Sequence, residues 1–157
     1  MTNIQEIIIA IQKYNQQEID TYGDGFLLEP ITKLQLENVQ MSSINLLSSR
    51  LSNDYLECLK ISDGFSINGL NLYSSIERET PYYLPDIITS NLAFWNEKEL
   101  KKYIAYGDEN SSRLVFDIEK NKFMSVDYVT WEPIKEFNEF YQLLSFVLTE
   151  ANILDIN

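Results

Sequence analysis

The period of the hydrophobic pattern changes along this chain of 157 residues. Near the N-terminus, apolar residues recur at helical spacing, at Ile4, Ile7, Ile8, Ile11 and Tyr14. After Gly64 the apolar residues alternate with polar ones as they do in strands, and beyond Pro133 the helical spacing returns. Helices first, strands in the middle and a helix at the end predict a single α+β domain over 1–157 rather than a series of βαβ units.

The helical segments carry recognisable end signals. Thr2 and Gln5 have the spacing of a capping box, in which each side chain bonds an orphan amide of the first helical turn. Ser52 is a good N-cap residue, and Gly64 stands where a left-handed C-terminal cap would end that helix. Helices are therefore expected over 3–18, after Thr32, after Ser52, over 86–102 and beyond Pro133.

Short strands are predicted between these helices. Asn68-Gly69 separates two short apolar runs, and this dipeptide is typical of the two-residue turn of a β-hairpin. The polar, proline-containing stretch 77–85 is expected to be a surface loop. Three further strands are expected over 103–106, 114–118 and 123–128.

The composition excludes several kinds of function. Histidine is absent, which excludes an imidazole general base and a histidine metal ligand. The single cysteine, Cys58, can form neither an internal disulfide nor a multi-cysteine zinc site, and it is expected to pack on the apolar face of its helix. With 12 basic and 24 acidic residues the net charge is 12 − 24 = −12, and this negative charge repels nucleic-acid phosphates. We therefore expect a binding protein with no enzymatic activity, no cofactor and no nucleic-acid partner.

The sequence also lacks the marks of a targeting segment or a membrane span. Residues 1–6 do not have the basic region of a signal peptide. No stretch approaches the roughly 18 consecutive apolar residues that a transmembrane helix needs. We expect a cytoplasmic protein without a membrane partner.

A group of carboxylates in the C-terminal third has three possible interpretations. Paired carboxylates can hydrolyse glycosides, and clustered ones can bind calcium or magnesium. However, residues 107–111 lack the alternating acidic positions and the distant glutamate of a calcium loop. Turn chemistry, in which acidic side chains bond the backbone of polar loops, is the favoured interpretation. The carboxylates concerned are those of Asp108, Glu109, Asp117, Glu119 and Asp127.

Aromatic content and acidity both favour a contact surface. The chain holds 10 tyrosines, 8 phenylalanines and 2 tryptophans, and exposed tyrosine and tryptophan are typical anchors of protein interfaces. Residues 103–157 carry 4 basic and 10 acidic side chains, so 4 − 10 = −6 of the net charge lies there. An acidic surface would accelerate association with a basic partner. Solubility alone is the other explanation of the charge, and the sequence leaves both open.

Several segments resemble the SUKH superfamily, which comprises bacterial immunity proteins and relatives of the yeast cell-wall-assembly regulator. Residues 51–65, Leu-Ser-Asn-Asp-Tyr-Leu-Glu-Cys-Leu-Lys-Ile-Ser-Asp-Gly-Phe, are similar to its signature L-P-x-x-Y-x-x-x-L-x-x-x-N-G-F. Ser52 and Asp63 replace the usual proline and asparagine but keep the capping and turn chemistry, whereas Ser112-Arg113 stands where a Gly-Asp is common. The resemblance spans about 30–148 and includes 68–73, the hairpin 106–117, the strand 126–131 and the closing helix with Phe137-x-x-Phe140.

The resemblance implies an α+β domain with a curved, mainly antiparallel sheet flanked by N- and C-terminal helices. It also implies a non-enzymatic role, in which the protein binds and blocks a cognate toxin, for instance a basic nuclease. An intracellular scaffold or regulator that binds other proteins is the alternative. The residues predicted to line the contact face are Tyr73, Tyr106, Asp108, Asp117, Asp127 and Trp131.

Overall fold

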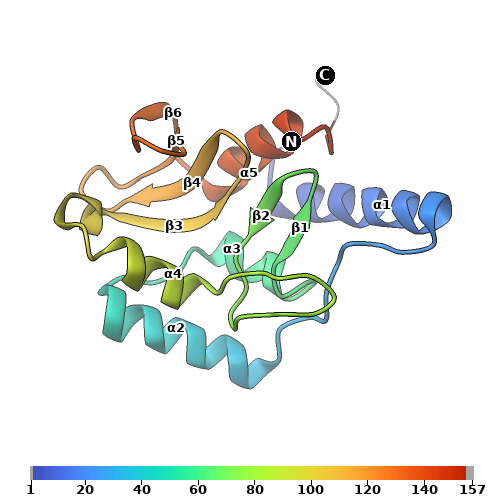
Figure 1. Cartoon of the computed structure of the whole chain (residues 1–157), viewed down its shortest axis with the longest axis horizontal. Helices are drawn as coiled ribbons and strands as arrows, with labels where there is room; N and C mark the ends of the chain where they lie inside the picture. The colour runs from blue at the N-terminus through green and yellow to red at the C-terminus, as the bar shows by residue number, and fades with distance from the viewer. Residues whose placement is uncertain (1, 155–157) are drawn as a thin grey trace.

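The computed structural model describes residues 2–154, and this part of the chain confirms the prediction of a single α+β domain. Within it the helices are α1 (Ile4–Tyr22), α2 (Lys33–Leu47), α3 (Asn53–Leu59), α4 (Ile87–Phe94), the 3-10 helix η1 (Lys98–Lys102) and α5 (Phe140–Glu150). The strands are β1 (Phe65–Ile67), β2 (Leu70–Leu72), β3 (Tyr103–Asp108), β4 (Ser112–Asp117), β5 (Lys122–Asp127) and β6 (Pro133–Phe137). They form one antiparallel sheet in which the strand order follows the sequence (Figure 1).

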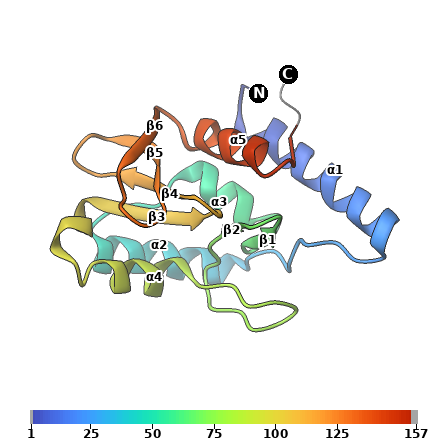
Figure 2. The ribbon, with the colours of Figure 1, turned by 45° about the horizontal axis from the view of Figure 1, so that its top comes forward.

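Helices cover both faces of the sheet (Figures 1 and 2). On one face α4 lies against β3, where the Asn91 side chain donates to Ala105 O at 2.9 Å and accepts from Ala105 N at 2.7 Å. Helix α2 packs against α4 on this side. On the other face α5 packs on β5 and β6, and α1 and α3 pack against α5. The core therefore lies in two layers, one on each side of the sheet.

Helix α1 begins with a different cap from the predicted one. The Asn3 side chain, rather than that of Thr2, accepts a hydrogen bond from Glu6 N at 3.0 Å. Thr2 instead donates from its amide and its hydroxyl to the Glu6 carboxylate. The reason is that the helix starts one residue later than expected, so that Asn3 occupies the N-cap position. The helix ends at Tyr22, four residues later than expected, and Gly23 is its left-handed C-cap at φ 90°.

Gly64 is not the C-terminal cap of α3. The helix ends at Leu59 and Ser52 caps its start, as predicted, by accepting from Tyr55 N. Gly64 has a φ of 79°, and a Cβ there would lie 2.6 Å from Leu84 Cδ2 and 2.8 Å from Leu72 O. It is a glycine because the chain must pass close to β2 in a left-handed conformation as it enters β1.

The strands that the alternating pattern predicts after Gly64 are present in the structure. Phe65 pairs with Leu72 across the predicted hairpin, and Asn68 and Gly69 form its turn with φ of 52° and 82°. The three strands expected over 103–106, 114–118 and 123–128 are present as β3, β4 and β5, each with boundaries shifted by one or two residues.

Two predicted helices are shorter than expected. The segment 86–102 is interrupted after Phe94, where Trp95 Nε1 donates to Tyr103 O at 2.8 Å and ties the end of α4 to the start of β3. The segment from Pro133 begins with the edge strand β6, and the helix starts only at Phe140. Pro133 is tolerated in β6 because an edge strand does not need every amide as a donor.

An aromatic cluster fills the layer between the sheet and α5. The rings of Tyr55, Tyr106, Phe123 and Phe140 pack on one another with centroids 4.9 to 6.1 Å apart. Such tilted and edge-on contacts stabilise a core beyond the area that they bury. None of the helices within 2–154 has both the length and the apolar character required to cross a membrane.

Candidate functional site

Three of the predicted contact residues are buried, so their assignment to an exposed contact face is wrong. Tyr106 and Tyr73 are each 1% exposed and Asp117 is 2% exposed. A bulge between Ala105 and Gly107 turns Tyr106 toward the aromatic cluster, where its hydroxyl accepts from Ser52 N at 2.9 Å. Asp117 ends β4 and accepts from Lys120 N at 3.0 Å, so it stabilises the β4–β5 turn at the far end of the strand.

The other predicted residues lie around an arginine that sequence reasoning did not select. Arg113, at the start of β4, contacts Asp108, Phe94, Tyr128 and Trp131, and we call these five residues the Arg113 cluster. Tyr73 lies beneath the cluster and Asp127 begins the turn that carries Tyr128 and Trp131. The structure thus brings Tyr73, Asp108, Asp127 and Trp131 together and leaves Tyr106 and Asp117 outside.

Asp108 accepts two hydrogen bonds from β2 and the residue that follows it. The Tyr73 hydroxyl donates to Asp108 Oδ2 at 2.8 Å and Asn71 Nδ2 donates to Oδ1 at 2.9 Å. Arg113 Nη1 lies 3.9 Å from the same Oδ2. Burial, followed by the negative charge of Asp108, raises the pKa of Tyr73 well above 10.0, so its phenol stays protonated and remains a donor. Asp108 is therefore a partly buried, bonded carboxylate rather than a free surface charge.

The Arg113 guanidinium is packed between aromatic rings. Its central carbon lies 3.9 Å from the ring centroid of Tyr128 and 4.9 Å from those of Phe94 and Trp131. Its Nε donates to Tyr128 O at 3.0 Å. Stacking of this kind stabilises the cation and fixes the rings, because the planar guanidinium fits between them.

Residues 127–131 form a tight turn, which we call the 127–131 turn. Asp127 Oδ2 accepts from Val129 N at 2.9 Å and Thr130 N at 2.8 Å, and these bonds lower the pKa of Asp127. Trp131 N donates to Asp127 O at 3.0 Å, and its indole stacks on Tyr103 at 5.7 Å. The base of the turn is therefore fixed, while its tip is open to solvent, with Tyr128 40% and Val129 81% exposed.

The carboxylates of this region bind the protein's own donors. Glu109 Oε1 accepts from Ser111 N, Ser111 Oγ and Ser112 Oγ, while Asp117 and Asp127 accept from loop amides as described above. These bonds confirm the turn-chemistry interpretation for those three residues. Among residues 2–154, no three acidic or cysteine side chains are grouped so that they could hold a metal ion.

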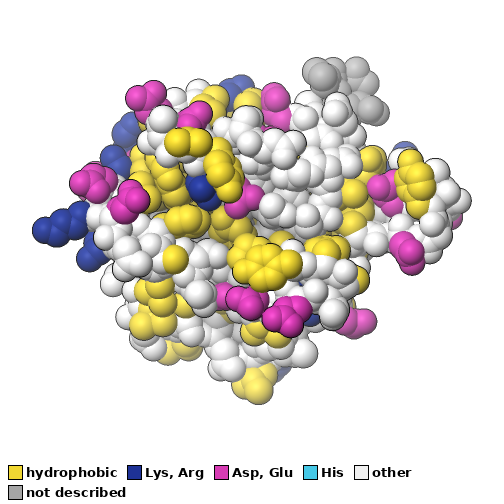
Figure 3. Space-filling model, in the orientation of Figure 1, with side chains coloured by type: hydrophobic (Ala, Val, Ile, Leu, Met, Phe, Trp, Pro, Cys, Tyr) yellow, Lys and Arg dark blue, Asp and Glu magenta, His cyan; other side chains and the backbone are white. Residues whose placement is uncertain are grey.

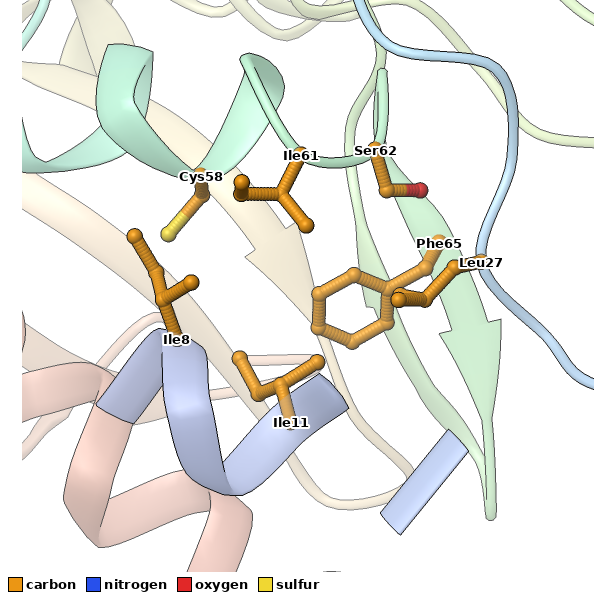
Figure 4. A pocket seen from close by; sticks show the side chains of 7 residues that line it. All are labelled: Ile8, Ile11, Leu27, Cys58, Ile61, Ser62 and Phe65. Atoms are coloured by element: carbon orange, nitrogen blue, oxygen red, sulfur yellow. The ribbon is translucent and has the colours of Figure 1, made fainter. Parts of the chain in front are cut away.

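A small apolar crevice between α1 and α3 is a packing feature. Its space is about 10 Å³, close to the least room that one water molecule needs. Burial raises the pKa of Cys58, which lines the crevice, so that the thiol stays protonated and acts as an apolar side chain. The side chains that surround it are Ile8, Ile11, Leu27, Cys58, Ile61, Ser62 and Phe65 (Figure 4).

A sequence signal for Arg113 does exist. In β4 the side chains of Arg113, Val115 and Asp117 share one face, and Val115 is fully buried. A basic residue on the same face as buried apolar residues needs a partner, and that requirement could have drawn attention to it.

No protein-family model and no curated protein matches the chain. The physical basis for a function is therefore the geometry of the Arg113 cluster and the 127–131 turn.

Proposed function

We propose that this chain is a cytoplasmic, non-enzymatic protein of the immunity type, which binds a toxin with a basic surface and neutralises it. The observation that carries the proposal is the 127–131 turn, whose exposed Tyr128 and Val129 project from a base held by Asp127 and Arg113. A basic nuclease domain is one partner of the required chemistry.

The rigidity of the turn supports a role in binding. A loop that is ordered before binding loses less conformational entropy when a partner covers it. Tyrosine adds a large contact area with few rotatable bonds, and the backbone of Tyr128 is tied by its amide to Ser111 O at 3.0 Å. The exposed tip therefore has the properties of an interface anchor.

Charge supports a basic partner. The chain carries −12 overall, and Asp127, Glu109 and Glu132 lie in or beside the turn. A basic surface would be attracted over a distance of about 10 Å at ordinary salt, whereas nucleic-acid phosphates would be repelled.

The SUKH resemblance adds support from the sequence. The implied architecture, a mainly antiparallel sheet with helices at both ends of the chain, agrees with the fold described above. Immunity proteins on this fold act by binding, and the proposal takes the role of this chain from that resemblance together with the turn. It does not name the partner, because one fold supports many binding specificities.

Co-expression tests the proposal. The chain is expressed in cells together with the product of each gene that adjoins its own, and growth is compared with and without the chain. We expect one neighbouring product to be toxic alone, to be harmless together with the chain, and to elute with it as a one-to-one complex. Growth that the chain never rescues, or several housekeeping partners in place of one tight one, would favour the scaffold alternative.

Charge reversal beside the turn tests the electrostatic part of the proposal. Glu132→Lys changes an exposed residue at the end of the 127–131 turn, and Glu37→Lys changes an exposed residue on α2 as the matched control. We expect Glu132→Lys to slow association with the toxin by a few-fold at low salt, less at high salt, and Glu37→Lys to leave the rate unchanged. Stopped-flow mixing measures the rates, and equal rates for the two variants would contradict this part.

A further inference from the structure

A second element projects from the same protein with exposed apolar side chains. It is the segment 76–84 between β2 and α4, which we call the β2–α4 loop (Figure 2). Ile76 is 45% exposed and Tyr83 is 61% exposed, whereas Leu84 is fully buried and anchors the loop. Leu84 therefore fixes one end of the loop directly beside the exposed Tyr83.

The loop is fastened to the body by an ion pair. Arg78 Nη2 lies 2.8 Å from Asp63 Oδ2, and the Asp63 side chain is completely buried. Asp63 also accepts from Ser75 N at 2.8 Å and from Ser75 Oγ at 2.7 Å. Each oxygen of the buried carboxylate thus has a donor, which is what makes such a pair stable.

Further bonds close the loop and fix its tip. Arg78 N donates to Leu84 O at 3.0 Å and Leu84 N donates to Arg78 O at 2.8 Å, so the two ends of the tip are joined. The Tyr82 hydroxyl donates to Phe26 O at 2.6 Å and accepts from Ser66 N at 3.0 Å. The loop is therefore ordered before any partner arrives.

The inward position of Arg78 makes the outer surface of the loop acidic. The sequence Glu77-Arg78-Glu79 alternates in charge, but the arginine faces Asp63 and the two glutamates are exposed. Neither glutamate forms an ion pair with any residue that the structure describes. The exposed surface of the loop thus combines two carboxylates with Ile76 and Tyr83.

The loop begins beside the Arg113 cluster. Tyr73, whose hydroxyl bonds Asp108, directly precedes Ser74, and Ser74 N donates to Pro85 O at the base of the loop. In Figure 3 hydrophobic side chains gather over strands β3–β5 and over the β2–α4 connection on the same face, with acidic side chains beside both. One partner can therefore cover both places.

We propose that the β2–α4 loop is a second contact element for the toxin, so that the inference rests on the proposed function and specifies the partner's surface. The toxin surface that fits the loop has an apolar socket for Tyr83 and basic side chains at its rim for Glu77 and Glu79. The ordered loop binds without a large loss of conformational entropy.

Two variants with matched controls test the inference. Tyr83→Ala removes the anchor, and Tyr22→Ala removes another exposed tyrosine at the end of α1. The double variant Glu77→Gln with Glu79→Gln removes the loop charges, and Glu37→Gln removes one charge on α2. The probe is the purified, catalytically inactivated product of the neighbouring gene that the chain neutralises. Calorimetry measures its affinity, and stopped-flow mixing measures its association rate. Unchanged melting temperatures and circular dichroism spectra show that the variants fold.

We expect Tyr83→Ala to weaken binding by about tenfold or more, as at interface hot spots. The double variant should slow association mainly at low salt, and both controls should bind like the wild type. Tight binding by the wild type and by both loop variants would overturn the inference and leave the proposed function standing. If the wild type binds no neighbouring product, the proposed function fails and the inference fails with it. If light scattering shows a dimer that Tyr83→Ala dissociates, the occupant is a second copy of the chain, which also overturns the inference.

Discussion

Two arginines in this acidic chain have mostly buried side chains that pair with aspartates. Arg78 bonds the buried Asp63 and Arg113 lies beside Asp108, and both guanidinium groups are mostly buried. In the sequence these residues look like ordinary solvated cations among many carboxylates. In the structure they hold two segments, the β2–α4 loop and the 127–131 turn, and their charge is directed inward.

Replacing Arg78 by methionine tests its structural role. Arg78→Met leaves the Asp63 carboxylate buried without a cation, and we expect the free energy of unfolding to fall by about 3 kcal/mol. Lys60→Met breaks an exposed ion pair with Glu57 and should cost less than about 1 kcal/mol. Urea denaturation measures both values. Equal losses in the two variants would mean that the Asp63–Arg78 pair is not a buried ion pair in solution.

Substitution of Gly107 tests how closely strands β2 and β3 approach each other. A Cβ at this position would lie 2.2 Å from Asn71 O, and the atom it would meet belongs to the backbone of β2. Because backbone cannot move aside as a side chain can, we expect Gly107→Ala to lower the free energy of unfolding by about 2 kcal/mol or more. An alanine variant with wild-type stability in chemical denaturation would contradict the observed spacing of β2 and β3.

At the scale of elements, most of the short-range signals were predicted correctly, whereas the edge strand β6 was not predicted. Ser52 and Asn68-Gly69 act as expected because a cap or a hairpin turn depends on a few neighbouring residues. The strand β6 was missed because its side chains are largely exposed on both faces and show no alternation. Its pairing with β5 is a long-range interaction that the local pattern does not contain.

The 127–131 turn should depend on the Asp127 side chain. Asp127→Ala removes the acceptor for Val129 N and Thr130 N, so hydrogen exchange at these two amides should become faster. Asp127→Asn keeps one acceptor oxygen and should slow the exchange again. Because the backbone bonds lower the pKa of Asp127, the charged form is favoured in the folded state, and its contribution is lost as pH falls through that lowered pKa. Exchange rates that are the same in all three proteins would show that other contacts hold the turn.

At the scale of the whole molecule, buried phenols link the two layers of the core. Tyr55 donates to Tyr73 O at 2.6 Å, Tyr73 donates to Asp108, and Tyr106 accepts from Ser52 N. Burial raises the pKa of all three phenols above the ordinary value of 10.0. The folded protein therefore retains these protons at a pH where the unfolded chain has lost them.

Alkaline titration tests this arrangement. Since the folded pKa values are raised, the contribution of the phenols to stability is complete below pH 10.0 and falls as pH rises above it. We expect unfolding and the absorbance of tyrosinate from these residues to appear together in one cooperative step. Tyrosinate absorbance from every tyrosine at a pH where the circular dichroism is still native would contradict the burial of the three phenols.

Tertiary packing explains why half of the predicted contact residues were misplaced. Tyr73, Tyr106 and Asp117 look like exposed candidates because exposed aromatic residues are typical interface anchors and because a carboxylate would attract a basic partner. The burial of Tyr106 depends on a bulge in β3 and on packing against Phe140 of α5, which lies far along the sequence. Tyr73 is buried where its hydroxyl bonds Asp108, and Asp117 where β4 pairs with Tyr103 of β3. Asp108, Asp127 and Trp131 do lie close to one exposed turn, although Asp108 and Trp131 are themselves partly covered.

By itself the sequence determined the α+β class, most helix starts, the hairpin turn and the absence of histidine chemistry. These properties depend on residue type and on spacing over a few positions, where hydrogen bonding and side-chain period act locally. Only the tertiary structure decided which tyrosines are buried, that Arg78 and Arg113 face inward, and that Glu77, Glu79 and Tyr83 face outward. The physical reason is that burial and ion pairing join residues distant in sequence, and one bulge or one strand register changes which side chains meet solvent.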